Sequence, residues 1–243
     1  MYSVRLLERA DLAACMELKD EAGWNQTEQD WLDLFEQAPQ GCFGIDVDGA
    51  LAGTATVVCY ETDLAWVGMV LTASRFRRRG IATALVEHAL AYAEARRIAW
   101  VKLDATPMGR PLYSRLGFED ECAIERWLRP GAPARSFPSE SLDIGAGFAR
   151  GRAGSQAAYF GPCQAGSPQA ARDLLEWFLD GHRGEAIYWD LLPHNAAAVD
   201  LACRHGFTRV RELVRMARRM RSDAPPLATD THRTYAIAGF EWG

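Results

Sequence analysis

An arginine-rich segment with one glycine carries the clearest chemical signal in this sequence. Gly80 follows four arginines, Arg75, Arg77, Arg78 and Arg79, and apolar residues at helical spacing begin at Ile81. The start of a helix carries about half a positive charge and unpaired N–H groups, so arginines there are unfavourable by roughly 0.3 to 1 kcal/mol each unless an anion binds. A pyrophosphate would satisfy them, and the alternative is a solvated basic surface.

A second pattern lies further along the chain. The strand-like segment 101–106 leads to Leu112, Tyr113, Leu116, Gly117 and Phe118, spaced as Leu-Tyr-x-x-Leu-Gly-Phe. A phenol with a pKa near 10 stays protonated at neutral pH, so Tyr113 could donate a proton to a leaving group. The alternative is structural, with Tyr113 in the core and Gly117 ending a helix.

The order strand, Arg77-x-x-Gly80-x-Ala82, helix, followed by this second pattern, resembles the cofactor signature of the GNAT superfamily of acyl-CoA-dependent N-acyltransferases. The resemblance implies an α/β fold (α+β, with a mixed sheet) of GNAT type and acetyl-CoA as co-substrate. It also implies that the backbone of the cofactor strand pairs with the pantetheine arm, and that the following loop holds the pyrophosphate. The implied cofactor-binding residues are Val70, Leu71, Thr72, Arg77, Arg78, Arg79, Gly80, Ile81, Ala82, Thr83 and Thr106. Thr106 stands where many relatives have Asn.

The resemblance further implies an N-acetyltransferase that moves an acetyl group to a primary amine by direct attack in a ternary complex. Tyr113 is the implied catalytic acid, and one strand N–H is the implied oxyanion-hole donor. Glu61 and Asp63 are near enough in sequence to serve as a base, although a turn between strands is the favoured interpretation. Metal ligation is not expected, because the histidines show no metal spacing.

The acceptor site is less well marked. Trp24, Asn25 and Gln26 interrupt two expected helices where GNAT proteins form one wall of the acceptor site. An aromatic ring and two amides could line a pocket there. The alternative is a helix end and connection, with Asn25 or Thr27 capping the next helix. The acceptor is expected to be a small-molecule or peptide amine, and a homodimer is left open.

Bulk composition narrows the class of protein. The chain has 243 residues, 49% of them hydrophobic and 24% charged, with a net charge of -5. An acidic total argues against nucleic acid as a partner. No run of 18 apolar residues and no signal-peptide pattern occurs, so a cytoplasmic protein without membrane association is expected. Six scattered cysteines without Cys-x-x-Cys are expected to be reduced.

The organisation suggests two related units. Strands are expected at 3–7, 42–46, 51–60, 65–72 and 99–105, and helices at 11–20, 28–37, 80–97 and 108–116. Domain boundaries are placed at 1–130 for a GNAT N-acetyltransferase domain, 131–139 for a Pro-rich linker, and 140–243 for a degenerate GNAT-like domain.

The second unit matches the first in part. Aligning Gly206-Phe207 with Gly117-Phe118 places Asn195 on Thr106 and Ala202 on Tyr113. A strand at 157–161 and a helix at 167–179, capped by Ser167, are expected with no arginine-glycine loop between them. The segment 145–151 is interpreted as a β-turn. The second unit is therefore expected to be structural and to bind no cofactor.

Two rivals belong to other classes of protein. In the first, the chain is a non-catalytic acyl-CoA-binding module that keeps the pyrophosphate site without productive chemistry. In the second, the arginine loop binds nucleic acid, which would require strongly salt-dependent affinity that CoA does not compete away.

Overall fold

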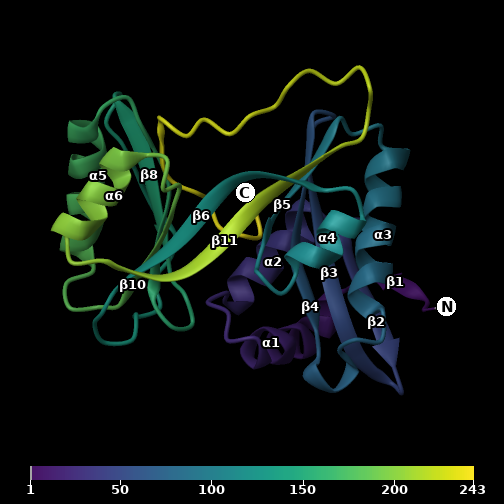
Figure 1. Cartoon of the computed structure of the whole chain (residues 1–243). Coiled ribbons are helices and arrows are strands. Elements are labelled where there is room, and N and C mark those ends of the chain that lie inside the picture. The colour runs from purple at the N-terminus through teal and green to yellow at the C-terminus, as the bar shows by residue number, and fades with distance from the viewer. Residues whose placement is uncertain (1) are drawn as a thin grey trace.

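The computed structural model describes residues 2–243, which form a mixed α/β fold around one twelve-stranded sheet. The strand order is β1-β2-β3-β4-β5-β11-β6-β10-β9-β8-β7, with β12 paired to β9 off this path. Two lobes share this sheet and are joined by the long β6–β11 ribbon (Figure 1). We call them the first and second lobe.

The first lobe contains the elements that precede the loop at 130–139. Its strands are β1 (Val4–Leu6), β2 (Cys42–Val47), β3 (Ala50–Tyr60), β4 (Leu64–Thr72), β5 (Trp100–Ala105) and β6 (Glu119–Arg129). Its helices are α1 (Leu12–Glu21), α2 (Glu28–Gln37), α3 (Ile81–Ala95) and α4 (Arg110–Arg115), with single 3₁₀ turns at Arg9–Asp11 and Ser74–Phe76. Apolar residues of α3 and of the strands form its main core, and α1 and α2 pack with Val58 and Met69 in a separate cluster.

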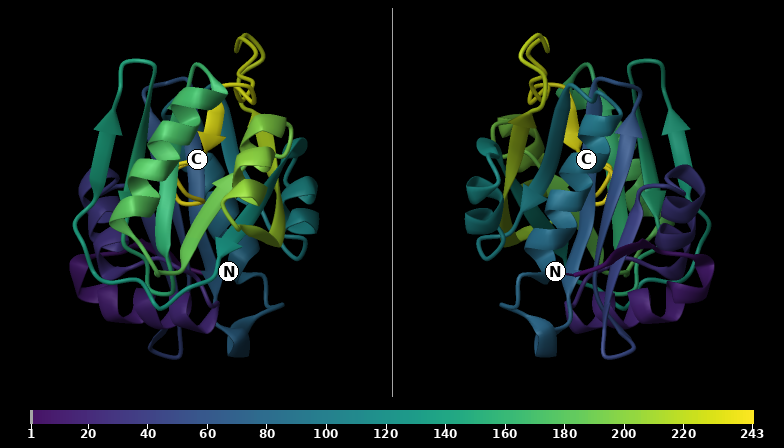
Figure 2. Two further views of the ribbon diagram at one scale, coloured as in Figure 1. Left: turned by 90° about the vertical axis from the view of Figure 1, so that its left-hand side faces the viewer. Right: turned by 90° about the vertical axis from the view of Figure 1, so that its right-hand side faces the viewer.

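The second lobe repeats this order in shorter form. Its strands are β7 (Glu140–Asp143), β8 (Gly147–Arg152), β9 (Ala158–Ala165), β10 (Ile187–Leu191), β11 (Thr208–Arg219) and β12 (Thr234–Ala236). Its helices are α5 (Pro168–Gly181) and α6 (Ala196–Arg204). Figure 2 shows α5 and α6 covering the outer face of this lobe, while α3 covers the opposite outer face of the molecule. We call the face of each lobe's sheet that is turned toward the other lobe the inner face.

The two lobes exchange a strand. β11 from the second lobe lies between β5 and β6, and β6 pairs on its other side with β10 of the second lobe. Each lobe therefore completes its sheet with the long strand of the other. The boundaries at 130 and 140 stay a prediction, but the hydrogen bonding of the sheet crosses them.

Corresponding residues support the internal repeat. Thr106 Oγ1 accepts from the Gly109 amide at 3.1 Å, and Asn195 Oδ1 accepts from the Ala198 amide at 3.2 Å, three residues on in both cases. Both glycines that end these helices, Gly117 and Gly206, are left-handed, with φ of 82° and 79°.

Two buried ion pairs repeat in the same way. Arg126 on β6 forms a bidentate pair with Asp190 on β10, at 2.8 and 2.7 Å. Arg215 on β11 pairs with Asp104 on β5 at 2.9 and 3.0 Å. Arg126 and Arg215 occupy equivalent positions when Gly117 is aligned with Gly206, so the central ribbon carries one motif twice.

In the second lobe, β9 and β10 separate after a short parallel pairing, and β12 pairs with β9 beyond that point. β9 pairs in parallel with β10 only from Ala158 to Phe160, and further along the same edge it pairs with β12 through Cys163 and Gln164. The Trp189 indole on β10 donates to the Tyr235 carbonyl on β12 at 2.8 Å. A segment from near the C-terminus thus lies where β9 and β10 diverge.

Most of the elements expected in the first lobe are confirmed, and α2 matches at both ends. In the second lobe, the Ser167 hydroxyl caps α5 as expected by accepting from the Ala170 amide. The segment 145–151 turns at Gly145, but from Gly147 it continues as strand β8, so a β-turn alone was incomplete.

Candidate active site

The opening between β4 and β5 is the counterpart of the opening that β12 fills. Parallel pairing joins Leu64, Ala65 and Trp66 to residues 100–102, and it stops there although β4 continues to Thr72. Leu71 and Thr72 pair with β3 on the other side. The edge of β4 beyond Trp66 therefore faces β5 without ladder hydrogen bonds to it. An extended chain could pair with this edge, as β12 pairs with β9.

A β-bulge at Met69 changes the direction of the backbone groups along this edge of β4. Met69 has a φ of 47°, and the β3–β4 register shifts between Gly68 and Leu71. The Thr54 hydroxyl donates to the Met69 carbonyl at 2.7 Å and holds that carbonyl toward β3. A bulge frees backbone groups from the regular ladder, so the amides near Val70 can face a ligand. The structure thus places Val70, Leu71 and Thr72 on the part of the β4 edge that has no ladder hydrogen bonds to β5.

The arginine loop lies at the end of the same strand. Arg78 and Gly80 are left-handed, with φ of 63° and 86°, and Gly80 is the N-cap residue of α3. Within residues 2–243, the amides of residues 78–83 donate to no other backbone group. A Cβ at Gly80 would meet nothing within 4 Å, so the backbone there is open to an approaching group. Consecutive free amides at a helix N-terminus suit a phosphate.

The arginine side chains leave positive charge at this loop. Arg77, Arg78 and Arg79 are exposed, and none of them forms an ion pair within the described chain. The Arg77 guanidinium donates to the Thr72 carbonyl at 3.2 Å, and the Tyr2 hydroxyl donates to the Arg79 carbonyl at 2.9 Å. The loop is therefore held in shape while its amides and charges stay available. These observations fit the pyrophosphate of an acyl-CoA.

Tyr113 lies on α4, beside the end of β5. Its ring packs edge-on against Phe118 at 6.0 Å, and its side chain lies so close to Gly109 that a Cβ there would be 2.9 Å from the ring. Burial raises the pKa of Tyr113 above its usual value, because the phenolate would lose its hydration. Its hydroxyl makes no hydrogen bond within residues 2–243. The structural interpretation of the Tyr113 ring is therefore confirmed, and the catalytic role of its hydroxyl, which burial keeps protonated, stays a prediction.

The Trp24–Gln26 segment connects the two lobes. Asn25 is buried, and its side chain exchanges hydrogen bonds with the backbone of Gln156 and Ala157, at 2.9 to 3.0 Å. The Gln26 amide donates to Glu241 at 2.8 Å. Thr27 rather than Asn25 caps α2. An acceptor-binding role for this segment stays a prediction, and its contacts give it a docking role as well.

The base candidates named from the sequence lie in the turn between β3 and β4. Glu61 and Asp63 are exposed, and the Asp63 carbonyl accepts from the Trp100 amide. Asp63 is separated from Val70 by most of the length of an extended strand, roughly 20 Å. The turn interpretation is the better one. Among residues 2–243, no cluster of three His, Cys, Asp or Glu side chains is arranged to hold a metal, and no helix is long and apolar enough to span a membrane.

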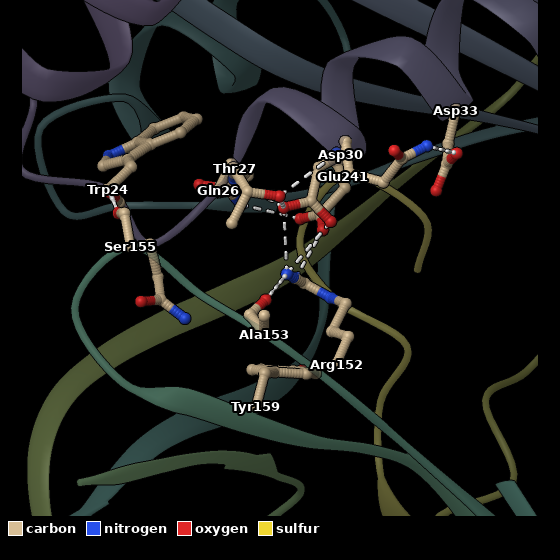
Figure 3. A network of polar contacts seen from close by, with 12 residues as sticks. Trp24, Gln26, Thr27, Asp30, Asp33, Arg152, Ala153, Ser155, Tyr159 and Glu241 are labelled. Atoms are coloured by element: carbon tan, nitrogen blue, oxygen red, sulfur yellow. Dashed lines mark hydrogen bonds and ion pairs between the residues drawn. The ribbon is translucent and has the colours of Figure 1, made fainter. Parts of the chain in front are cut away.

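Sequence reasoning missed a buried polar cluster, drawn in Figure 3, which lies against Gly68 of β4. Arg152 on β8 contacts Asp30 on α2 at 3.0 Å and Glu241 near the C-terminus at 2.6 Å, while Gln26 donates to Glu241. We call Gln26, Asp30, Arg152 and Glu241 the Glu241 cluster. The one sequence signal for it is a carboxylate between two aromatic residues in the closing Phe240-Glu241-Trp242 segment.

Comparisons with known proteins show which family the chain belongs to. A model of the acetyltransferase (GNAT) family matches residues 8–118, and a model of the acetyltransferase (GNAT) domain matches residues 114–236, just over half of the chain. An uncharacterized N-acetyltransferase of Methanocaldococcus jannaschii is 30% identical over 105 residues, which cover 40% of this chain and 46% of that relative. This chain therefore matches less than half the length of its curated relative.

Solved structures share the fold over nearly the whole chain. A Pyrococcus horikoshii protein proposed to be an acetyltransferase superposes with a TM-score of 0.81 at 18% identity, covering 100% of this chain and 96% of that one. A GCN5-related N-acetyltransferase from Sphaerobacter thermophilus gives 0.68 at 16% identity, covering 95% and 98%. A tandem GNAT protein from the clavulanic acid biosynthesis pathway gives 0.67 at 12% identity, covering 92% and 100%. With two GNAT units in tandem and the family's fold, the chain belongs to the GNAT family of acetyltransferases, an acyltransferase family of enzymes.

Proposed function

We propose that the protein transfers an acetyl group from acetyl-CoA to a primary amine by direct attack in a ternary complex formed at the first lobe. The observation that carries this proposal is the combination of the free β4 edge with the unpaired amides of the arginine loop at its end. One ligand with an extended arm and a pyrophosphate would use both features. Acetyl-CoA, when bound, supplies the activated acetyl group and a thiolate leaving group.

Different residues of the first lobe would bind different parts of acetyl-CoA. The amides of Arg78 to Thr83, with the neighbouring guanidinium groups, would hold the pyrophosphate through charge-assisted hydrogen bonds. The freed strand edge at Val70 to Thr72 would pair with the pantetheine arm, and one of its N–H groups would face the acetyl oxygen. Such a donor typically lowers the barrier by about 3 to 4 kcal/mol.

Tyr113 would protonate the departing sulfur, and the proton that the attacking neutral amine loses as the amide forms would return to the tyrosinate, directly or through solvent. Burial keeps its hydroxyl protonated well above neutral pH, and the hydroxyl has no partner within residues 2–243 that would compete for the proton. A thiol has a pKa near 8.5, so a proton from the enzyme makes the thiolate a better leaving group at neutral pH.

The second lobe is proposed to bind no acyl-CoA. β12 already lies in its strand opening, and only Gly166 and Ser167 separate β9 from α5, where the first lobe has the arginine loop. Ala202 stands at the position equivalent to Tyr113. We also propose a cytoplasmic location, which six free cysteines support.

The proposal is tested by binding and turnover measured on the full chain. Calorimetry should detect acetyl-CoA binding, and this binding should weaken several-fold in Arg78→Ala and Arg79→Ala. A thiol-release assay over a panel of primary amines should then reveal at least one acceptor. Binding without transfer to any amine would support the rival acyl-CoA-binding module, and absence of binding would overturn both functions.

A further inference from the structure

The Glu241 cluster lies against the strand that would carry the acetyl group. A Cβ built on Gly68 of β4 would be 2.9 Å from the Glu241 Cα and 3.2 Å from the Thr56 hydroxyl oxygen. Gly68 is two residues from Val70, or about 7 Å along an extended strand. Glu241 therefore lies close to the proposed transfer position, on the inner face of the first lobe.

Charge in this cluster is unbalanced. Two carboxylates, Asp30 and Glu241, face one guanidinium, Arg152, and the side chains of all three are largely buried. Arg126, whose charge also acts on the cluster, is already paired with Asp190. The cluster therefore carries one more negative than positive charge, although both carboxylates are hydrogen-bonded: Asp30 also accepts from the Thr27 amide at 2.6 Å and from the Thr27 hydroxyl at 2.9 Å, and Glu241 accepts from Gln26. An excess charge is unfavourable in a buried environment.

Three buried polar atoms in or next to the cluster also lack partners within residues 2–243, and one of them is the donor Arg152 Nε. The Gln26 side-chain oxygen has no donor, although Gln26 is only 2% exposed and its amide nitrogen is bound to Glu241. The Thr56 hydroxyl has no partner either and is fully buried next to Gly68. Buried polar groups are normally satisfied, so the Gln26 oxygen indicates a missing donor, whereas Arg152 Nε indicates a missing acceptor. A primary ammonium carries three N–H donors and one positive charge, so it would supply the missing donor and balance the extra carboxylate.

We propose that the Glu241 cluster binds a second, cationic end of the acceptor, so that the acceptor class is a diamine or another amine with a distal ammonium group. This inference rests on the proposed function. The distal ammonium would be held by Glu241, Asp30 and the Gln26 oxygen, while the other amine is directed toward the acetyl group. An acceptor with a carboxylate at its far end would be repelled.

Access to the cluster requires movement of the segment 237–243, because Glu241 is fully buried. This segment is fixed to the first lobe through its backbone: the Trp66 indole donates to the Phe240 carbonyl at 2.9 Å, and the Tyr60 hydroxyl donates to the Trp242 carbonyl at 2.7 Å. Gly239 and Gly243 flank Glu241 with φ of 136° and 104°. Glycine reaches such angles without strain, so the proposal places the pivots of this movement at Gly239 and Gly243.

The test compares three acceptors of equal length that differ only at the far end: 1,4-diaminobutane, butylamine and 4-aminobutyrate. We expect the wild-type kcat/KM to be about ten- to a hundredfold higher for the diamine than for butylamine, and lowest for 4-aminobutyrate. In Glu241→Gln the ratio of diamine to butylamine should fall toward one, with the KM for acetyl-CoA unchanged. Glu36→Gln, the same change at an exposed position of α2, should keep the wild-type ratio.

The ratio between acceptors is insensitive to partial unfolding, because a smaller active fraction lowers all rates equally. An equal preference for diamine and butylamine in the wild type, or a ratio unchanged by Glu241→Gln, would overturn the inference and leave the transferase proposal standing. Acetyl-CoA binding with no transfer to any of the three amines would also overturn it. Loss of acetyl-CoA binding itself would instead be a failure of the proposed function.

Discussion

Replacing Tyr113 by Phe removes one hydroxyl from the candidate active site and leaves the ring in place. The ring contacts with Phe118 and Gly109 do not involve the hydroxyl, which makes no hydrogen bond within residues 2–243. The substitution therefore leaves no buried polar group without its hydrogen-bond partner, and the free energy of unfolding should change by less than about 0.5 kcal/mol. For a chain of this size that corresponds to a Tm shift of about 1 to 2 °C.

The effect on turnover should be much larger. A positioned general acid contributes about 10² to 10⁴ in rate, so kcat should fall at least about a hundredfold, or about 2.7 kcal/mol in activation free energy. The affinity for acetyl-CoA should hardly change, because the pyrophosphate and the arm would be held by the loop and by β4. Since burial raises the pKa of Tyr113, the wild-type enzyme should lose no activity from ionisation of this residue up to about pH 10.

The assay is thiol release under saturating amine, with acetyl-CoA affinity measured separately by calorimetry and Tm by thermal unfolding. Tyr92→Phe is the matched control, because Tyr92 lies on α3 of the same lobe and packs edge-on against Phe43 at 5.3 Å, away from the proposed site. The control should retain wild-type turnover. An unchanged kcat in Tyr113→Phe, with normal Tm, would show that solvent protonates the thiolate and that Tyr113 is only a core residue.

Three other predictions address the loop, the exchanged strands and the buried carboxylate. Gly80→Ala should destabilise the fold by about 1 kcal/mol, because Gly80 is left-handed, and should also weaken acetyl-CoA binding. Thermal unfolding measures the first effect and calorimetry the second. Unchanged binding would contradict a direct contact between the ligand and the backbone at Gly80. Residues 1–139 alone should show no cooperative unfolding transition, because they lack β11, and adding residues 140–243 should restore it; a cooperative melt of the fragment would refute the need for exchange. Burial raises the pKa of Glu241, so the folded state binds its proton more tightly than the unfolded state and stability should decrease as pH rises above about 4.5. Glu241→Gln should remove that part of the slope in pH-dependent denaturation, with Asp30 and Arg152 intact, and an identical slope would contradict it.

The first lobe was largely predictable because its signals are local. The Arg77-x-x-Gly80-x-Ala82 pattern specifies a strand end, a left-handed glycine and a helix start within a few residues, and the structure contains all three. The Thr27 cap at the start of α2 is equally local. Such features depend on neighbours along the chain, which a sequence displays directly.

The strand exchange and the Glu241 cluster depend instead on distant partners. The sequences of β6 and β11 do not indicate which lobe each strand joins. Judged by its own pattern, β6 could pair with β5 and β11 could pair with β10, the strands that precede them in the chain. Gln26 and Glu241 are 215 positions apart, and the residues around either one do not indicate the other as its partner. A carboxylate in a short aromatic segment signals burial, but its partners become known only from the folded chain.

The position of β12 has a consequence for stoichiometry. A strand that belongs to the same chain competes with any soluble ligand at an effective concentration on the order of millimolar, whereas a free coenzyme must arrive by diffusion. The edge of β9 is thus kept paired with a strand of the same chain, so under the proposed function only the first lobe offers an unpaired strand edge to acetyl-CoA. A titration of the intact molecule should accordingly saturate at a single equivalent of acetyl-CoA per polypeptide rather than at two.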